Sequence, residues 1–231
     1  MKFSIHLFSV ILMTLGTPVM AQDAQQVTLR FLSFPKNASP QPVELIIGEG
    51  EVLEVKIPTN ALSQPYKVKR LPTWAVGKME PAADGKQVFK SYGSAPSLAS
   101  ASQIILLIRS GKENADGMKV IPIANNTANF GGGKFFFMNA SKVDIAGALG
   151  GTKFTLKPGK QTIIEPKELN KREGGGAAGF FTEFFFRKEE EARPFFSSTW
   201  PANDKARSMV FFYHDTRNDR LRMHTIRDYI P

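Results

Sequence analysis

The sequence predicts an all-β fold, an antiparallel β-sandwich, with two sandwich domains in tandem. Short runs rich in β-branched and aromatic residues recur along the chain, whereas no window longer than about ten residues shows apolar residues at helical spacing. Turn sequences such as Gly150-Gly151 and Pro158-Gly159 separate the runs. These connections are too short for helical crossovers, so we expect neighbouring strands to pair antiparallel.

The first half holds a clear hairpin signal. Two runs flank Gly48-Glu49-Gly50-Glu51, whose glycines permit the positive φ that a tight turn requires. The continuous apolar run 104–108 is typical of a strand covered on both faces. Residues 58–102 are rich in Pro, Ser and Ala, and we expect only short edge strands and loops there. The strands predicted in this half are 27–34, 43–47, 52–57, 66–68, 73–76 and 103–109.

The second half repeats this pattern with more phenylalanine. The clusters Phe180-Phe181, Phe184-Phe185-Phe186 and Phe211-Phe212-Tyr213 place rings on both faces of their strands, which favours burial between two layers. The alternative is that one face packs against a protein partner or a second copy. The only helix-compatible stretch is short, at 188–192. The strands predicted in this half are 118–123, 134–139, 143–148, 152–156, 161–164, 179–187, 194–199, 208–214 and 220–226.

The N-terminus has the features of a secretory signal peptide. Lys2 precedes an apolar run that is shorter than the ~20 residues of a membrane-spanning helix, and small residues lead to a predicted cleavage after Ala21. We therefore expect a signal peptide at 1–21, an exported protein, and no transmembrane segment after cleavage. A polar, glycine-containing segment at 110–117 suggests a domain boundary, with one sandwich at 22–112 and a phenylalanine-rich one at 117–231.

Charge and cysteine content narrow the classes of partner. Lys2 is the only charged residue before Gln22, so signal cleavage lowers the formal net charge from +9 to +8. Outside the cytoplasm this charge favours acidic polysaccharide or lipid head groups as partners, rather than nucleic acid. The chain has no cysteine, so disulfides cannot stabilise it and packing must do so.

The sequence contains no motif that predicts catalysis, a cofactor or a metal centre. Gly131-Gly132-Gly133-Lys134 leads into a strand, not into the helix N-terminus that a phosphate-binding loop needs. A three-residue loop at 218–220 would place His214 opposite His224, with Asp215 beside the first, but a zinc site would need a third firm ligand. We therefore predict no catalytic residues, no cofactor and no metal.

The last predicted strand suggests a binding surface instead. Arg220, Arg222 and His224 alternate with apolar residues and so share one face. Arg207, Arg217 and Arg227 lie near by in sequence. Aromatic side chains of the same region could stack on a sugar or cover a head group. The predicted ligand-binding residues are Trp200, Tyr213, His214, Arg220, Arg222 and His224; the alternative is a solvated sheet face without a ligand.

One stretch resembles a pattern found in uncharacterised exported bacterial β-sandwich proteins. It comprises Phe137-Met138-Asn139-Ala140-Ser141, then Ile145 and Leu149-Gly150, and Phe154-Thr155-Leu156-Lys157-Pro158-Gly159, about 25 residues in all. The resemblance implies a β-sandwich and export, and it carries no functional residues. In physical terms Asn139 can close a turn through its side chain, and Pro158-Gly159 can set the next reversal.

Three functional hypotheses follow, in order of preference. The first is a non-enzymatic exported protein of the cell envelope that binds or scaffolds an anionic component, either polysaccharide or lipid head groups. The second is a subunit of an envelope protein assembly, held through its phenylalanine-rich strands. The third is a carbohydrate-active hydrolase, whose paired carboxylates can be recognised only by their separation in space.

Overall fold

The computed structural model describes residues 26–34, 42–109, 117–170, 178–188, 191–215 and 218–230. Throughout these ranges the regular structure is β-strand, so the predicted all-β class is confirmed. No helix in the described ranges is long and apolar enough to cross a membrane. The predicted signal peptide lies outside the described residues. The strands are β1 (Gln26–Phe34), β2 (Val43–Ile46), β3 (Val52–Val55), β4 (Tyr66–Lys69), β5 (Thr73–Pro81), β6 (Gln87–Pro96), β7 (Ser102–Arg109), β8 (Met118–Ala124), β9 (Phe135–Asn139), β10 (Ile145–Leu149), β11 (Thr152–Leu156), β12 (Gln161–Ile164), β13 (Gly179–Lys188), β14 (Glu191–Pro201), β15 (Ala206–His214) and β16 (Leu221–Tyr229).

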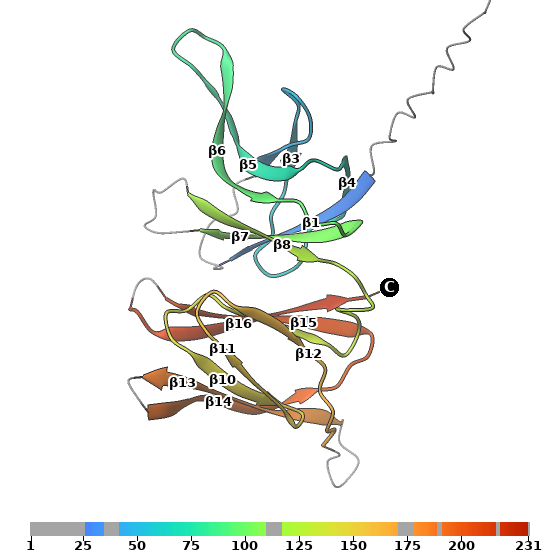
Figure 1. Cartoon of the computed structure of the whole chain (residues 1–231), viewed down its shortest axis with the longest axis vertical. Helices are drawn as coiled ribbons and strands as arrows, with labels where there is room; N and C mark the ends of the chain where they lie inside the picture. Colours follow the sequence, from blue (N-terminus) through green and yellow to red (C-terminus); the bar gives the residue numbers. More distant parts are fainter. Residues whose placement is uncertain are drawn as a thin grey trace, which may run out of the picture.

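The strands form four sheets of four strands, which stack as two β-sandwiches (Figure 1). The first sandwich has an outer sheet of order β3-β2-β5-β6 and an inner sheet of order β4-β1-β7-β8. The second has an inner sheet of order β12-β9-β15-β16 and an outer sheet of order β11-β10-β13-β14. The two inner sheets face each other across the middle of the molecule, and the β5–β6 hairpin projects from the far end of the first sandwich (Figure 1).

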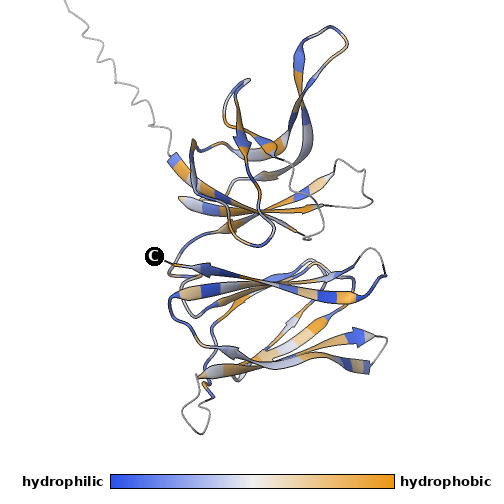
Figure 2. Cartoon of the chain, turned by 180° about the vertical axis from the view of Figure 1, so that it is seen from behind, coloured by the Kyte–Doolittle hydropathy of each residue, from blue (hydrophilic) through white to orange (hydrophobic). Residues whose placement is uncertain are grey.

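Three apolar cores hold the four layers together, and Figure 2 shows hydrophobic residues on the strands of all of them. The first core lies within the first sandwich, around Trp74 and Phe31. The second core lies within the second sandwich, around Phe137 and Phe184. A central core joins the two inner sheets, where side chains such as Leu106 meet Phe211 and its neighbours. The inner sheets are therefore buried on both faces.

Burial on both faces explains the continuous apolar runs of the sequence. Residues 104–107 of β7 are fully buried, as the run 104–108 predicted, and every residue of β9 is buried. Phe211 points into the central core and Phe212 into the second core, so the prediction of burial between two layers is confirmed for β15. It is wrong for β13, which lies in an outer sheet. There Phe184 is buried, whereas Phe181 is 45% exposed on the outward face.

The two sandwiches have the same topology, which the sequence analysis did not anticipate. Adding eight to each strand number of the first sandwich reproduces both sheet orders of the second. In both, the first strand pairs parallel with the seventh, as β1 does with β7 and β9 with β15. In both, a bulge interrupts the fifth and sixth strands, at Val76/Gly77 and at Phe184/Phe185. The chain is thus a structural duplication whose halves meet through equivalent faces, as subunits do in an isologous dimer.

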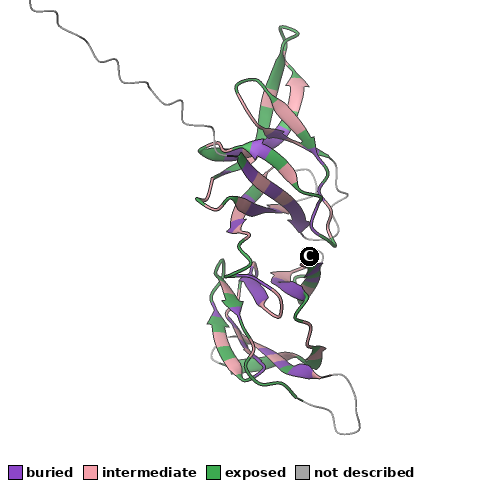
Figure 3. Ribbon diagram, turned by 90° about the vertical axis from the view of Figure 1, so that its right-hand side faces the viewer, coloured by how far each residue is buried: buried purple, intermediate pink, exposed green. Residues whose placement is uncertain are grey.

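Some expectations about the strands need correction. The two parallel pairings depart from the antiparallel rule, because the first strand of each sandwich lies beside the seventh and not beside the second. Strand β6 was not predicted, because Gln87–Pro96 is mostly exposed and has no apolar period; pairing with β5 holds it in place (Figure 3). Within the helix-compatible stretch 188–192, Glu191 and Ala192 begin β14.

The transition between the sandwiches follows β8. Residues 110–116 of the expected boundary segment lie outside the described residues. The next strand, β8, pairs antiparallel with β7 and completes the first inner sheet. The chain therefore changes sandwich after Ala124, and β9 is the first strand of the second.

Candidate functional site

The register of the final hairpin decides where the predicted binding residues lie. His214 pairs with Leu221, and His224 pairs with Phe211. The expected three-residue loop is wrong, because the loop runs from Asp215 to Arg220 and is closed by a 2.9 Å hydrogen bond from Asp215 N to Arg220 O. The observed partner of His214 lies three residues before the expected one, His224. Because three is an odd number, the two histidines face opposite sides of the sheet.

The separation of the histidines removes the metal hypothesis in its original form. No group of three or more potential metal ligands occurs within the described part of the chain. His224 faces the first sandwich, where its ring stacks on Phe34 with centroids 6.1 Å apart. Its Nε2 lies 3.2 Å from the carbonyl oxygen of Thr59. His224 is therefore part of the contact between the sandwiches.

Tyr213 and Arg222 face each other across the hairpin. The Tyr213 ring packs edge-on against Phe34, with centroids 4.6 Å apart. Burial raises the pKa of the Tyr213 hydroxyl, the nearby Asp215 carboxylate raises it further, and the Arg222 guanidinium opposes both. The hydroxyl therefore stays protonated and can donate a hydrogen bond. Arg222 remains accessible, with its side chain 48% exposed and its Nε 3.9 Å from Asp215.

The His214 side chain connects the hairpin to a neighbouring loop. Lys142 N donates to His214 Nδ1 at 3.2 Å, and Lys142 Nζ pairs with Asp219 at 3.1 Å. Both contacts are made by loop 139–144, which links β9 to β10.

Asn139 organises that loop from a fully buried position. Its Nδ2 donates to the carbonyl oxygens of Val143 and Leu156, each at 2.8 Å. Its Oδ1 accepts from Ser141 N at 2.9 Å and from Ser141 Oγ at 2.6 Å. The prediction that Asn139 closes a turn is confirmed. Its backbone also fixes the next reversal, because Gly159 N donates to Asn139 O at 2.7 Å and Gly159 has a φ of 76°.

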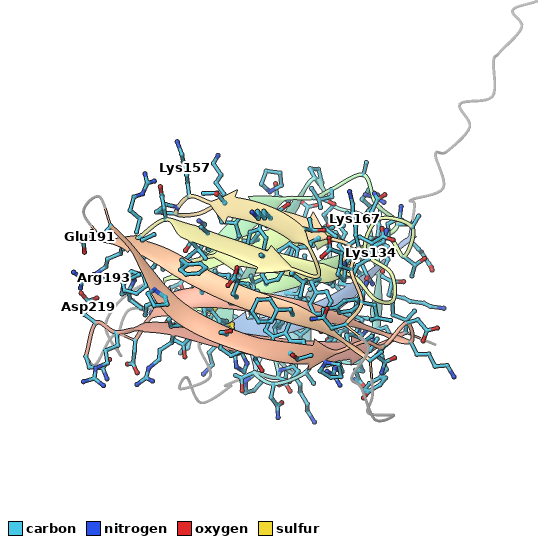
Figure 4. All side chains as sticks on the ribbon, turned by 90° about the horizontal axis from the view of Figure 1, so that it is seen from below. Lys134, Lys157, Lys167, Glu191, Arg193 and Asp219 are labelled. Atoms are coloured by element: carbon cyan, nitrogen blue, oxygen red, sulfur yellow. The ribbon has the colours of Figure 1, made fainter. Side chains whose placement is uncertain are left out.

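These contacts assemble one end of the second sandwich, which we call the hairpin end. It comprises loop 139–144, turn 157–160, Arg187, Asp215 and residues 218–220, together with Arg222. Arg187 belongs to it because its N donates to Asp144 O at 3.0 Å. Figure 4 shows Lys157, Asp219, Glu191 and Arg193 at this end of the strands, and Lys134 and Lys167 at the other.

The hairpin end is rich in cations. Glu191 and Arg193 beside it pair with each other at 3.5 Å and add no net charge. No ion pair of Lys157, Lys160, Arg187 or Arg220 occurs among the described residues, and all four are exposed. The described charged residues of the end are the cations Lys142, Lys157, Lys160, Arg187, Arg220 and Arg222 and the acids Asp144, Asp215 and Asp219.

Two of the residues considered from sequence lie elsewhere. Trp200 is in β14, where its ring stacks on Phe135 with centroids 5.5 Å apart and packs into the second core. Arg207 is buried and donates to Asp228 at 2.8 Å, so it is not available to a ligand. Arg217 lies outside the described residues. The fold thus gathers Tyr213, Arg220 and Arg222 at the hairpin end, and His214 on the opposite face of the sheet holds loop 139–144 through Lys142 N.

Sequence reasoning missed the cations that other segments bring to this end. Lys142, Lys157, Lys160 and Arg187 are distant in sequence from the final hairpin, and no spacing rule connects them. The available signal was the Asn139-x-Ser141 and Pro158-Gly159 pair of turns, whose contact draws two of these segments together.

The glycine-rich loop before β9 has a packing explanation. A Cβ on Gly132 would lie 1.6 Å from the carbonyl oxygen of Asp204, so only glycine fits there. Lys134 Nζ donates to Ala128 O at 3.1 Å and pairs with Glu165 at 3.3 Å. The loop is thus tied to its own neighbours.

Comparison with known proteins adds no assignment, since neither a protein-family model nor a curated protein matches the sequence.

Proposed function

We propose that the chain is an exported, non-enzymatic protein of the cell envelope that binds an anionic envelope component, polysaccharide or lipid head groups, at the hairpin end. The observation that carries this proposal is the gathering of six cations from four segments of the chain around three acids. Four of the cations have no acidic partner among the described residues, so their charge is available to a ligand.

The geometry favours a surface interaction over a deep site. Lys157, Lys160 and Arg220 stand on turns and loops, where their side chains can adapt to a polymer or a layer of head groups. Arg187 and Arg222 stand at the ends of strands and supply planar guanidinium donors, which suit phosphate and carboxylate oxygens. The protonated hydroxyl of Tyr213 lies opposite Arg222 and adds a neutral donor.

The test compares two variants that each lose three positive charges. Lys157→Gln/Lys160→Gln/Arg220→Gln changes the hairpin end, and Lys56→Gln/Lys78→Gln/Lys86→Gln changes exposed lysines of the first sandwich. We expect the wild type to bind vesicles containing phosphatidylglycerol, or a soluble polyuronate, with an affinity that falls as salt is added. The hairpin-end variant should bind roughly tenfold or more weakly, since each cation near an anionic surface contributes about 1 kcal/mol.

The outcomes separate the possible ligands. Binding to vesicles alone identifies head groups, and binding to polyuronate alone identifies polysaccharide. Equal losses of affinity in the two variants would show that binding depends on net charge alone, and would contradict a site at the hairpin end. Absence of binding to either probe by the wild type would contradict the proposal itself.

A further inference from the structure

The four described sheets have eight edge strands, and seven of them are protected against pairing with another chain. Strands β3, β4 and β12 have four residues each and β11 has five, too few to serve as long templates. Strand β6 carries a bulge and lies against β8, because a Cβ on Gly93 would be 2.0 Å from Met118 O. Strands β8 and β14 contain proline. Only β16 remains.

The prolines of β8 and β14 occupy the positions that face the free edge. Asn125 N donates to Ser102 O, so the odd-numbered residues of β8 bond to β7 and Pro122 faces outward. Ala202 N donates to Ala178 O, so Pro201 likewise faces away from β13. A proline at such a position removes an edge donor without loss of a ladder bond. Pro122 lies inside its strand, and a bulge beside Pro194 also interrupts the edge of β14, so neither edge can accept a regular added strand.

Strand β16 lacks each of these protections. It has nine residues, a regular register with β15 and no proline. Ile230 N donates to Lys205 O, so the even-numbered residues bond to β15 and the odd-numbered ones direct their N–H and C=O groups to the free edge. Alignment of the duplicated halves by strand register places Thr225 at the position of Pro122. The edge strand β16 of the second sandwich can thus pair with an added strand, whereas the equivalent edge of the first sandwich, β8, is closed by Pro122.

Accessibility and charge indicate what this edge accepts. Thr225 and Arg227 are exposed, and Tyr229 is 65% exposed. The accessible charges of β16 are the cations Arg222 and Arg227, because its one acid, Asp228, is buried between Arg30 and Arg207. A second copy of this chain would bring the same cations together. An acidic segment would complement them.

We propose that the free edge of β16 binds an extended acidic segment of a partner protein by β-strand addition. Its main chain pairs with the outward groups of Leu221, Met223, Thr225, Arg227 and Tyr229. Arg222 and Arg227 project to opposite faces of the sheet, so the carboxylates of an alternating acidic strand pair with Arg222 or with Arg227, according to the face that they occupy. The surrounding cations also deter other positively charged strands, which gives the edge selectivity.

The test uses Thr225→Pro, which copies the residue of the closed edge, with Thr225→Val as the matched control that keeps the N–H. The probe is an alternating Glu-Val peptide with blocked ends, compared with an alternating Lys-Val peptide. We expect the acidic peptide to bind the wild type and Thr225→Val equally, and to bind Thr225→Pro roughly tenfold or more weakly. In the wild type, the bound peptide should slow amide exchange at Met223, Thr225 and Arg227. Circular dichroism checks that the fold of each variant is kept.

Each contrary result has a distinct meaning. Equal binding to Thr225→Pro, or equal binding of the Lys-Val peptide, would overturn strand addition by an acidic segment. Sedimentation showing a wild-type dimer that Thr225→Pro dissociates would assign the edge to a second copy. Binding to vesicles or polyuronate at the hairpin end should be unchanged in Thr225→Pro. Failure of strand addition can therefore be distinguished from failure of the proposed anion binding.

Discussion

Arg30 and Asp228, which are 198 positions apart in the sequence, form an ion pair that joins the two sandwiches, with Arg30 Nη1 3.1 Å from Asp228 Oδ1. Arg207 approaches the same carboxylate from within the second inner sheet, with its Nη2 2.8 Å from Oδ2. Arg207 Nη1 also donates to Phe130 O, and its guanidinium lies over the Phe130 ring. One buried carboxylate therefore satisfies two arginines at the border of the central core.

Replacement of Asp228 tests the strength of this junction. Asp228→Asn removes the charge and leaves Arg207, which is 3% exposed, without its counter-ion. We expect a loss of about 3–5 kcal/mol in the free energy of unfolding, as when one partner of a buried ion pair is removed. Denaturant unfolding measures it. Asp84→Asn, which breaks the exposed pair with Lys86, is the control and should cost less than about 1 kcal/mol. Similar effects of the two changes would contradict the inferred role.

The central core also predicts that the two sandwiches unfold together. The inner sheets share side chains such as Phe34, Leu106 and Phe211 in one cluster, so exposure of either sheet removes the cover of the other. The two tryptophans report on separate halves, Trp74 from the first core and Trp200 from the second. In Trp200→Phe, fluorescence follows the first sandwich alone, and its transition should coincide with that of the far-ultraviolet circular dichroism. Two separate transitions would refute this coupling.

The sequence predicted local structure well where one residue pattern had one explanation. The strand at 27–34, the hairpin at Gly48–Glu51 and the apolar run of β7 are all present, because each is determined by neighbours in sequence. The duplication was not predicted, because many equivalent positions share their burial but not their residue type. Leu106 corresponds to Phe211, for example, and Trp74 to Thr182, so a comparison of letters finds no repeat.

The candidate site was predictable only in part. Alternation along β16 placed Arg222 and His224 on one face, as found. That face is turned toward the first sandwich, whose residues cover His224. Its environment depends on the packing of the two inner sheets, which no local pattern specifies. The register was missed because a loop of uncertain length decides it, and loop 215–220 contains its own hydrogen-bonded turn.

Asn139 links the stability of the hairpin end to its proposed binding function. Asn139→Ala removes the donor to the Leu156 carbonyl oxygen in a buried contact, and one of the two donors to the Val143 carbonyl oxygen, so we expect a loss of about 2–3 kcal/mol in the free energy of unfolding. The loop that carries Lys142 should also become mobile, which would weaken binding to anionic vesicles. Ser141→Ala is the control, because it removes the hydroxyl contacts with Asn139 Oδ1 and Val143 but keeps both amide donor contacts of Asn139, so it should cost less. Equal stability of Asn139→Ala and the wild type would show that water replaces the missing donor.

Tyr213 predicts how stability responds to alkaline pH. Its pKa is raised in the folded protein by burial and by Asp215, so the folded state keeps the phenol proton at pH values where the unfolded chain releases it. The contribution of Tyr213 to stability is therefore complete below its unfolded pKa of about 10 and declines as pH rises through the folded value. Absorbance near 295 nm should show one tyrosine ionising later than the exposed Tyr229. In Tyr213→Phe this late step should vanish and the alkaline loss of stability should be smaller, whereas an unchanged titration would assign the late step to another tyrosine.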